Sequence, residues 1–248
     1  MKIGIIGFGN LGRALASGLI MSGTDPGDIC ICDNSSDARM IAGNEYHTQT
    51  SEDINFVAGC SDIIFLTVKS YVFEELSQLI DRRHLDGKTI VSFMAGVQFE
   101  KIYSLIGEAR VVRAMPSLAI AACDGVIGYT KAPAEVAEIF DKLGYAFETD
   151  PENIEKVMAF SSCGLGFAAY LIDAFASAGQ TMGFSSETSA RIAALTFKNA
   201  VERGNFRETV KAVATPGGAT EQGILHMDGS NVYDIVEGAV RKAYERMK

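Results

Sequence analysis

Three glycines near the N-terminus have a spacing that suits a phosphate ligand. Gly7, Gly9 and Gly12 form a G-x-G-x-x-G pattern in "IGIIGFGNLGRALASGLI", after a short apolar run and at the start of a helical pattern. In that context the glycines allow a tight turn, close approach of a pyrophosphate, and close helix–strand contact. The phosphates then meet free N–H groups at the positive end of a helix dipole. We predict a dinucleotide site with contacts from Gly7, Phe8, Gly9, Asn10, Leu11 and Gly12.

An acidic residue at the end of the next apolar run bears on which dinucleotide binds. Asp33 follows "DICIC" at a distance from the glycines where a carboxylate hydrogen-bonds a ribose hydroxyl, which favours NAD. The following residues, Asn34, Ser35 and Ser36, can instead hydrogen-bond a 2′-phosphate, and Arg39 is expected in a turn. We predict contacts from Asp33, Asn34 and Ser35 and leave NADP or NAD open. The alternative for Asp33 is an ordinary turn carboxylate.

Two further strand ends supply predicted cofactor contacts. Val68 and Lys69 end the strand-like run in "LTVKSY", and Ala95 and Gly96 end the next one in "FMAGV". Ligands of open α/β sheets gather outside the carboxyl ends of the strands. We therefore expect these four residues beside the cofactor. A solvated lysine and a plain strand-end turn are the alternatives.

A glycine-containing turn interrupts the helical C-terminal third. In "KAVATPGGATEQGI", Pro216, Gly217 and Gly218 stop a helix, and the backbone N–H groups of Gly217 to Thr220 can hold a carboxylate. A threonine hydroxyl at Thr220 can donate a hydrogen bond to an imine nitrogen. We predict Thr220 as the catalytic residue. The predicted substrate contacts are Thr215, Pro216, Gly217, Gly218, Ala219 and Thr220. A simple interhelical loop is the alternative.

The residue types favour an imine over an alcohol as the reducible group. An alcohol dehydrogenase needs a general acid/base such as His or Lys near the reacting carbon. The glycine-rich stretch "SSCGLGFAAYLIDA" has no lysine, and His226 is a lone histidine of the kind that is more often structural. A protonated imine is already electrophilic, so positioning and one hydrogen-bond donor suffice.

The elements that must position these residues change character near residue 150. Apolar strand patterns alternate with helical ones, which indicates a mainly parallel sheet covered on both faces. The strands are expected at 2–6, 28–33, 62–68, 88–94, 109–115 and 125–130, with helices at 10–22, 52–59, 71–81, 98–106 and 134–143. After Asp150 and Pro151, which begin a helix, only helix signals follow. We predict a dinucleotide-binding domain at 1–150 and a helical dimerisation and substrate domain at 151–248.

The helical part is unusually apolar. The segments 164–178 and 187–203 are apolar over more than one face, and 232–247 has one apolar stripe. Ser185 or Ser186 is expected to cap the middle helix and Gly204 to end it. A buried position and a subunit interface explain such helices equally well.

The bulk composition excludes several classes of protein. The chain has 248 residues, 48% of them hydrophobic, and a net charge of −9, so nucleic acid is an unsuitable partner. No apolar run is expected to span a membrane and no signal-peptide pattern is seen, so we expect a cytoplasmic protein. The five scattered cysteines are expected to be buried free thiols, and the three histidines lack metal-ligand spacing, so no metal is expected.

Taken together, the motifs resemble those of the pyrroline-5-carboxylate reductases, in order and over essentially the whole chain. They stand here as "GFGNLG", "VKSY", "MAGV", "RAMPSLA", "SSCGLGF" and "TPGGAT". The resemblance implies NAD(P)H-dependent reduction of the cyclic imine 1-pyrroline-5-carboxylate to proline. It also implies a homo-oligomer, at least a dimer through the C-terminal helices. Thr220 would then lie near the imine nitrogen, residues 215–219 would hold the carboxylate, and Lys69 would lie beside the cofactor.

Several positions depart from the family's pattern. The family's M-P-N-T-P has become Met115 to Ala119, S-G-S-G-P-A-Y has become Ser161 to Phe167, and V-K-P-Q has lost its proline to Ser70. These changes make the predicted pocket more apolar. Two alternatives therefore stay open: a related reductase for another small carboxylate-bearing imine or 2-keto acid, and a non-catalytic NAD(P)-binding protein on the same scaffold.

Overall fold

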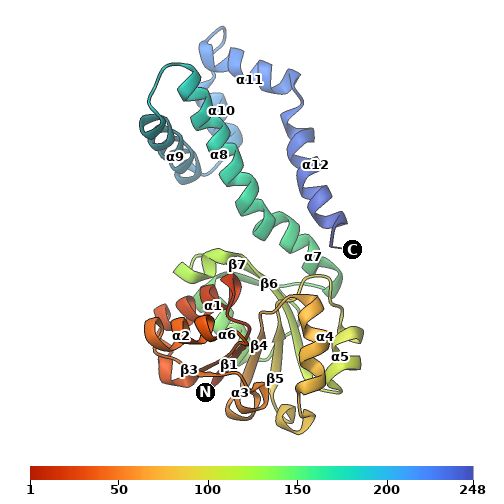
Figure 1. Ribbon diagram of the computed structural model, residues 1–248. Coiled ribbons are helices and arrows are strands. Elements are labelled where there is room, and N and C mark those ends of the chain that lie inside the picture. The colour runs from red at the N-terminus through yellow and green to blue at the C-terminus, as the bar shows by residue number, and fades with distance from the viewer. Residues whose placement is uncertain (248) are drawn as a thin grey trace. The chain divides into compact units, whose positions relative to one another are not determined.

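A computed structural model describes residues 1–247, and the chain divides into two compact units. The first comprises Met1–Ser162 together with the last few residues from Tyr244 onward, and the second is Cys163–Ala243 (Figure 1).

An eight-stranded sheet forms the centre of the first unit, in the order β3-β2-β1-β4-β5-β6-β7-β8. Only β7 against β6 is antiparallel, which confirms the mainly parallel sheet predicted from the sequence. The strands are β1 (Ile3–Ile6), β2 (Ile29–Cys32), β3 (Gln49–Ser51), β4 (Ile63–Leu66), β5 (Thr89–Ser92), β6 (Arg110–Pro116), β7 (Gly125–Tyr129) and β8 (Gly144–Glu148).

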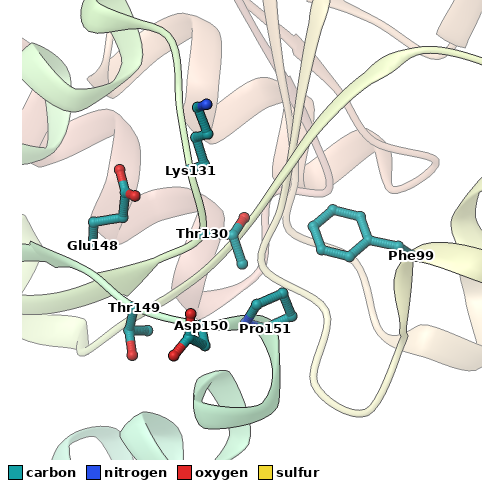
Figure 2. Close-up of a pocket in the computed structure, with 7 residues that line it drawn as sticks. All are labelled: Phe99, Thr130, Lys131, Glu148, Thr149, Asp150 and Pro151. Atoms are coloured by element: carbon teal, nitrogen blue, oxygen red, sulfur yellow. The ribbon is translucent and has the colours of Figure 1, made fainter.

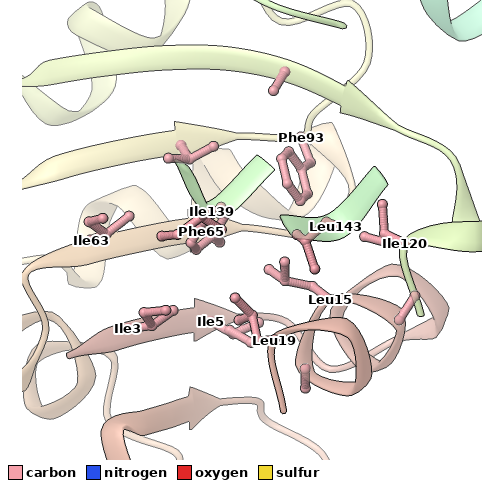
Figure 3. Close-up of a cluster of buried hydrophobic side chains, with 14 of the residues drawn as sticks. Ile3, Ile5, Leu15, Leu19, Ile63, Phe65, Phe93, Ile120, Ile139 and Leu143 are labelled. Atoms are coloured by element: carbon pink, nitrogen blue, oxygen red, sulfur yellow. The ribbon is translucent and has the colours of Figure 1, made fainter. Parts of the chain in front are cut away.

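Successive residues of the central strands serve two separate cores. Ile63 and Phe65 of β4 face one apolar cluster, whereas Ile64 and Leu66 face the other. This period-2 alternation with both faces apolar is what a doubly covered parallel sheet requires. Figure 3 shows the first cluster, where Leu15 packs over these strands. Burying each such side chain contributes roughly 1.5–3 kcal/mol.

Six helices cover the two faces of the sheet (Figure 1). Helices α1, α2 and α6 supply residues to the first cluster, and α3, α4 and α5 supply residues to the second. Their bounds are α1 (Asn10–Met21), α2 (Ser36–Glu45), α3 (Ile54–Cys60), α4 (Ser70–Leu79), α5 (Phe99–Ile106) and α6 (Ala134–Leu143). The sequence patterns missed α2, β3 and β8, and Arg39 lies in α2 rather than in a turn.

The link to the second unit begins as the sequence indicated. Pro151–Asn153 form a 3-10 turn that follows Asp150, and α7 (Ile154–Val157) continues from it. A π-helical segment, Met158–Ser162, then leads into α8 (Cys163–Thr181).

The second unit is entirely helical among its described residues. After α8 come α9 (Ser186–Arg203), α10 (Phe206–Val213), α11 (Ala219–Gly229) and α12 (Val232–Glu245). Ser185 caps α9 by accepting a hydrogen bond from the Thr188 N–H, and Gly204 ends the helix at φ 75°, as predicted.

The second unit has very little core of its own. Within α8 only Ala176 is buried, although the helix is largely apolar. The exposed apolar residues on α8 and just after it are Leu165, Tyr170, Leu171, Phe175, Met182 and Phe184. The expectation that no apolar run is long enough to span a membrane is wrong by length and composition, since an 18-residue stretch within the helical run 151–181 has a mean hydropathy of 1.5. From Cys163 onward that run belongs to the second unit, which exposes apolar side chains on several helices.

Candidate functional site

The glycine-rich turn between β1 and α1 has the geometry that the sequence pattern predicted. Gly7 has φ +97°, a conformation that favours glycine. A Cβ added at Gly12 would lie 2.1 Å from the Gly7 carbonyl oxygen, so helix and strand approach too closely for a side chain. A Cβ added at Gly9 would meet nothing within 4 Å, so the turn is open to a ligand there.

The start of α1 offers free donors beside that open space. The N–H groups of Asn10, Leu11 and Gly12 have no acceptor within residues 1–247, as expected for the first turn of a helix. An open backbone surface, free N–H groups and a helix N-terminus together fit the pyrophosphate of a nicotinamide dinucleotide. The residues present therefore suit the cofactor that the pattern implies.

Thr67, which sequence reasoning missed, fixes the turn from the neighbouring strand. Its hydroxyl lies 2.6 Å from the Gly7 carbonyl oxygen and 3.0 Å from that of Ile6. Since Thr67 follows β4 directly, it ties the turn to the carboxyl edge of the sheet. A threonine before "VKSY" carried no sequence signal of this contact, because the contact depends on the pairing of β4 with β1.

Asp33 lies against the same turn. Its Oδ2 accepts a 2.6 Å hydrogen bond from the Phe8 N–H, and its Oδ1 accepts a 2.8 Å bond from the Ser35 N–H. The Phe8 side chain is 1% exposed and packs edge-on against Tyr46. Phe8 therefore presents only backbone at the turn, and its predicted contact with a cofactor is limited to main-chain atoms.

The other predicted cofactor residues lie at strand ends. Val68 is half-buried, and a Cβ on Gly7 would lie 2.7 Å from its Cγ1, so Val68 borders the turn. Lys69 is exposed, precedes α4, and forms no ion pair with the described part of the chain. Gly96 has φ +70° in the turn after β5, next to the half-buried Ala95. Their roles toward a cofactor stay predictions.

The turn 215–218 separates α10 from α11, and Ala219 and Thr220 begin the second of these helices. Gly217 has φ +72°. The Gly218 N–H donates to the Thr215 carbonyl oxygen at 2.8 Å, which closes the turn. The N–H groups of Ala219 and Thr220 have no acceptor among the residues described, and both residues are exposed. These two donors remain available to a carboxylate.

Glu221 adds an acidic group that the sequence analysis did not consider. Its Oε2 accepts a 2.7 Å hydrogen bond from the Gly217 N–H. Of the four N–H groups expected to hold an anion, those of Gly217 and Gly218 are thus engaged internally. A carboxylate from the chain itself already lies at this turn, where the helix dipole also favours negative charge.

Arg113, the first residue of the "RAMP" segment in β6, forms a buried ion pair. Arg113 is completely buried and its Nη2 contacts the Glu155 Oε1 of α7. Its Nη1 donates to the Gln98 Oε1 at 2.9 Å, and the Phe99 ring lies 5.9 Å from its Cζ. Arg113 therefore joins the sheet to the start of α5 and to α7.

The cysteines of β2, Cys30 and Cys32, are free thiols buried among apolar side chains, as expected. Cys60, Cys123 and Cys163 are also free but only partly buried, so the expectation of burial is wrong for these three. Burial raises the pKa of Cys30 to about 11, and burial together with nearby Asp33 raises the pKa of Cys32 to about 12. Both stay protonated at neutral pH and offer no thiolate to chemistry.

A cavity of about 480 Å³ lies apart from the predicted residues. It is lined by Phe99, Thr130, Lys131, Glu148, Thr149, Asp150 and Pro151 (Figure 2). One cation, Lys131, and two carboxylates, Glu148 and Asp150, are among the residues that line it. None of the predicted cofactor, substrate or catalytic residues contributes to it.

Two family models match the chain, one for each predicted part. Residues 151–248 match the model for pyrroline-5-carboxylate reductase dimerisation. Residues 2–96 match the model described as NADP oxidoreductase coenzyme F420-dependent.

Relatives match the chain over its whole length. A pyrroline-5-carboxylate reductase of Aquifex aeolicus is 28% identical over 262 residues, covering 100% of this chain and 97% of the relative. Pyrroline-5-carboxylate reductase 3 of Danio rerio is 30% identical over 265 residues, covering 100% and 91%. The crystal structure of a Plasmodium falciparum pyrroline carboxylate reductase with NADP bound has a TM-score of 0.90 at 23% identity, covering 100% and 97%.

Proposed function

The chain belongs to the pyrroline-5-carboxylate reductase family, and from this membership we propose that it reduces the cyclic imine 1-pyrroline-5-carboxylate to L-proline with NADPH or NADH. The observation that carries the proposal is the full-length match, because it includes both the glycine-rich turn after β1 and the turn before α11. We infer a working division at residue 150, with 1–150 holding the cofactor and 151–248 serving dimerisation and substrate.

The reaction needs one hydride at the imine carbon and one proton at the imine nitrogen. A bound reduced nicotinamide would supply the hydride, and solvent water would supply the proton. The open turn at Gly9 and the free N–H groups at the start of α1 hold the pyrophosphate. The residues after β4 and β5, including Lys69 and Gly96, border the rest of the cofactor.

The turn 215–220 has the groups to bind and orient the substrate. The free N–H groups of Ala219 and Thr220 donate hydrogen bonds to the substrate carboxylate at the positive end of α11. The Thr220 hydroxyl donates a hydrogen bond to the neutral imine nitrogen and accepts one once that nitrogen is protonated. One side chain thus holds the nitrogen in both states, which orients the imine carbon for attack.

The helices of the second unit support a homodimer. The apolar side chains exposed on α8 are covered when two copies associate, and residues 151–248 match a dimerisation model. This explains a helical unit with almost no core of its own, and it explains the apolar run 151–181 without a membrane. We place the enzyme in the cytoplasm, and the molar mass in solution tests the dimer.

A steady-state assay tests the proposal. Purified protein should oxidise NADPH or NADH when 1-pyrroline-5-carboxylate is added, and should not do so without it. No turnover with either cofactor, in protein that melts cooperatively, would reject the function.

One observation on the segments that differ from the family's pattern favours a second candidate function, the reduction of another substrate. Leu118 is 48% exposed two residues after the end of β6, where the family carries a polar residue. An apolar group there suits a different small imine or 2-keto acid, and a panel of such substrates separates the two candidates. Binding of cofactor without turnover on any of them would indicate a non-catalytic protein.

A further inference from the structure

The peptide that joins Gly7 to Phe8 is held at both ends by side chains from neighbouring strands. The Gly7 carbonyl oxygen accepts the 2.6 Å hydrogen bond from the hydroxyl of Thr67, which directly follows β4. The Phe8 N–H, on the other side of the same peptide, donates its 2.6 Å bond to Asp33 after β2. Since a glycine adopts positive and negative φ about equally readily, Gly7 itself does little to fix this peptide plane. The two side-chain contacts fix it instead.

The Gly7 carbonyl oxygen depends on Thr67 for its donor. The Ile6 carbonyl oxygen, 3.0 Å from the same hydroxyl, already accepts the Thr67 N–H at 2.9 Å, so the single hydroxyl proton is left for Gly7. No backbone N–H within residues 1–247 donates to the Gly7 carbonyl oxygen. From the α1 side the Gly12 Cα packs against that oxygen, because a Cβ there would lie 2.1 Å from it. Loss of the hydroxyl therefore leaves a packed carbonyl oxygen without its donor.

The next carbonyl of the turn is also held by a side chain. The Phe8 carbonyl oxygen accepts a 3.2 Å bond from the Arg13 Nε, and the Arg13 Cζ lies 5.7 Å from the centre of the Phe8 ring. The carbonyl oxygens of Gly7 and Phe8 are thus both bound by protein groups, whereas the open space of the turn lies at Gly9. A pyrophosphate there meets the free N–H groups at the start of α1, and the two oxygens that would repel it are held by side chains.

We propose that Thr67 is a positioning residue for the cofactor: its hydroxyl holds the Gly7 carbonyl oxygen on the protein side of the turn and so keeps the turn ready for the pyrophosphate. Without that hydroxyl the Gly7–Phe8 peptide rotates more freely, and binding has to restore its orientation. The pyrophosphate is common to NADH and NADPH, so the effect is the same for both. The inference rests on the proposed use of a nicotinamide cofactor, but not on the identity of the imine.

Cofactor binding measured without any imine tests this role. Thr67→Val keeps the shape of the side chain and removes its hydroxyl, so it should weaken binding of NADH and of NADPH by about tenfold each in titration calorimetry, with their affinity ratio unchanged. Thr67→Ser keeps the hydroxyl and should bind both within about threefold of wild type. Binding of both cofactors by Thr67→Val within about twofold of wild type would overturn the proposal, as would an equal loss in Thr67→Ser.

A matched control separates this role from a loss of stability. The Thr48 hydroxyl also donates to a backbone carbonyl oxygen, that of Ala42, at 3.0 Å. Thr48 precedes β3, so it lies at the amino ends of the strands, whereas the turn lies at their carboxyl ends. Thr48→Val should lower Tm without changing either affinity. An equal weakening of cofactor binding in Thr48→Val would assign the Thr67→Val effect to stability alone and contradict the positioning role.

The wild-type protein gives a result even if Thr67→Val fails to fold. In a crystal structure with ADP-ribose, which carries the pyrophosphate without the nicotinamide, the Thr67 hydroxyl should still donate to the Gly7 carbonyl oxygen. A rotated Gly7–Phe8 peptide with that oxygen toward the pyrophosphate would overturn the proposal, and so would wild-type protein that binds neither cofactor. Cofactor binding that depends on Thr67, in protein without imine turnover, would contradict the proposed substrate and leave this role standing.

Discussion

Replacing Glu155 by glutamine should destabilise the first unit strongly. Arg113 is fully buried and the Glu155 side chain is 7% exposed, so water cannot solvate the Arg113 guanidinium once the negative charge of Glu155 is removed. The remaining partners of Arg113 are neutral, namely the Gln98 amide oxygen at 2.9 Å and the Pro151 carbonyl oxygen at 3.4 Å. Removing one partner of a buried ion pair costs about 3–5 kcal/mol, and glutamine retains an acceptor, so we expect about 3 kcal/mol.

Thermal and urea unfolding at neutral pH measure this cost. A loss of about 3 kcal/mol corresponds to a Tm lower by about 6–12 °C for a unit of this size. Glu152→Gln, three residues earlier and exposed, is the control and should change stability by less than about 0.5 kcal/mol. The double variant Arg113→Met/Glu155→Leu should recover most of the loss, because apolar residues replace a buried pair without an unpaired charge. A Glu155→Gln protein within about 1 kcal/mol of wild type would refute the reasoning.

Three further predictions concern single residues. Thr220→Ala should lower kcat/KM for the imine by about 10- to 100-fold through loss of one hydrogen bond, with Thr220→Ser restoring most of it; an unchanged rate would remove Thr220 from the mechanism. Glu221→Gln should lower KM for the imine severalfold with little change in kcat, because the carboxylate at the Gly217 N–H no longer opposes the substrate's charge; a higher KM would mean that Glu221 helps binding. Cys32 has a pKa raised to about 12 by burial, so the unfolded chain loses its proton first, and stability should fall as pH rises from about 8.5. Cys32→Ala should flatten that slope in urea titrations, and an equally steep slope would contradict the assignment.

The sequence predicted the central strands well because they are apolar on both faces. Strands β1, β2 and β4 are buried at every position, so each appears as a short continuous apolar run. Strand β5 is equally buried but has its apolar pair between Thr89 and Ser92. The edge strands lack that signal. β3 is "QTS", and β8 alternates partly exposed residues. Helix α2 escaped detection because it buries only Ala38 and Ala42, which leaves no apolar stripe.

Local chemistry was easier to predict than contacts between distant segments. The tight turn at Gly7, the helix break at Gly217 and the end of α9 at Gly204 follow from residue type and are confirmed. The Thr67 contact with Gly7 depends on pairing between strands 60 residues apart, which no local pattern reports. Glu221 lies four residues after Gly217, and at this spacing its carboxylate accepts a hydrogen bond from the Gly217 N–H. The same contact is also an ordinary way to cap the start of a helix. The boundary at residue 150 and the roles of the site residues stay predictions.

Transfer of label from the cofactor tests the central claim most directly. Reduced cofactor carrying deuterium at both C4 positions is incubated with the protein and 1-pyrroline-5-carboxylate, and the product is analysed by mass spectrometry. The account predicts proline with a single deuterium at the former imine carbon. Unlabelled proline, or no proline in the presence of bound cofactor, would contradict it.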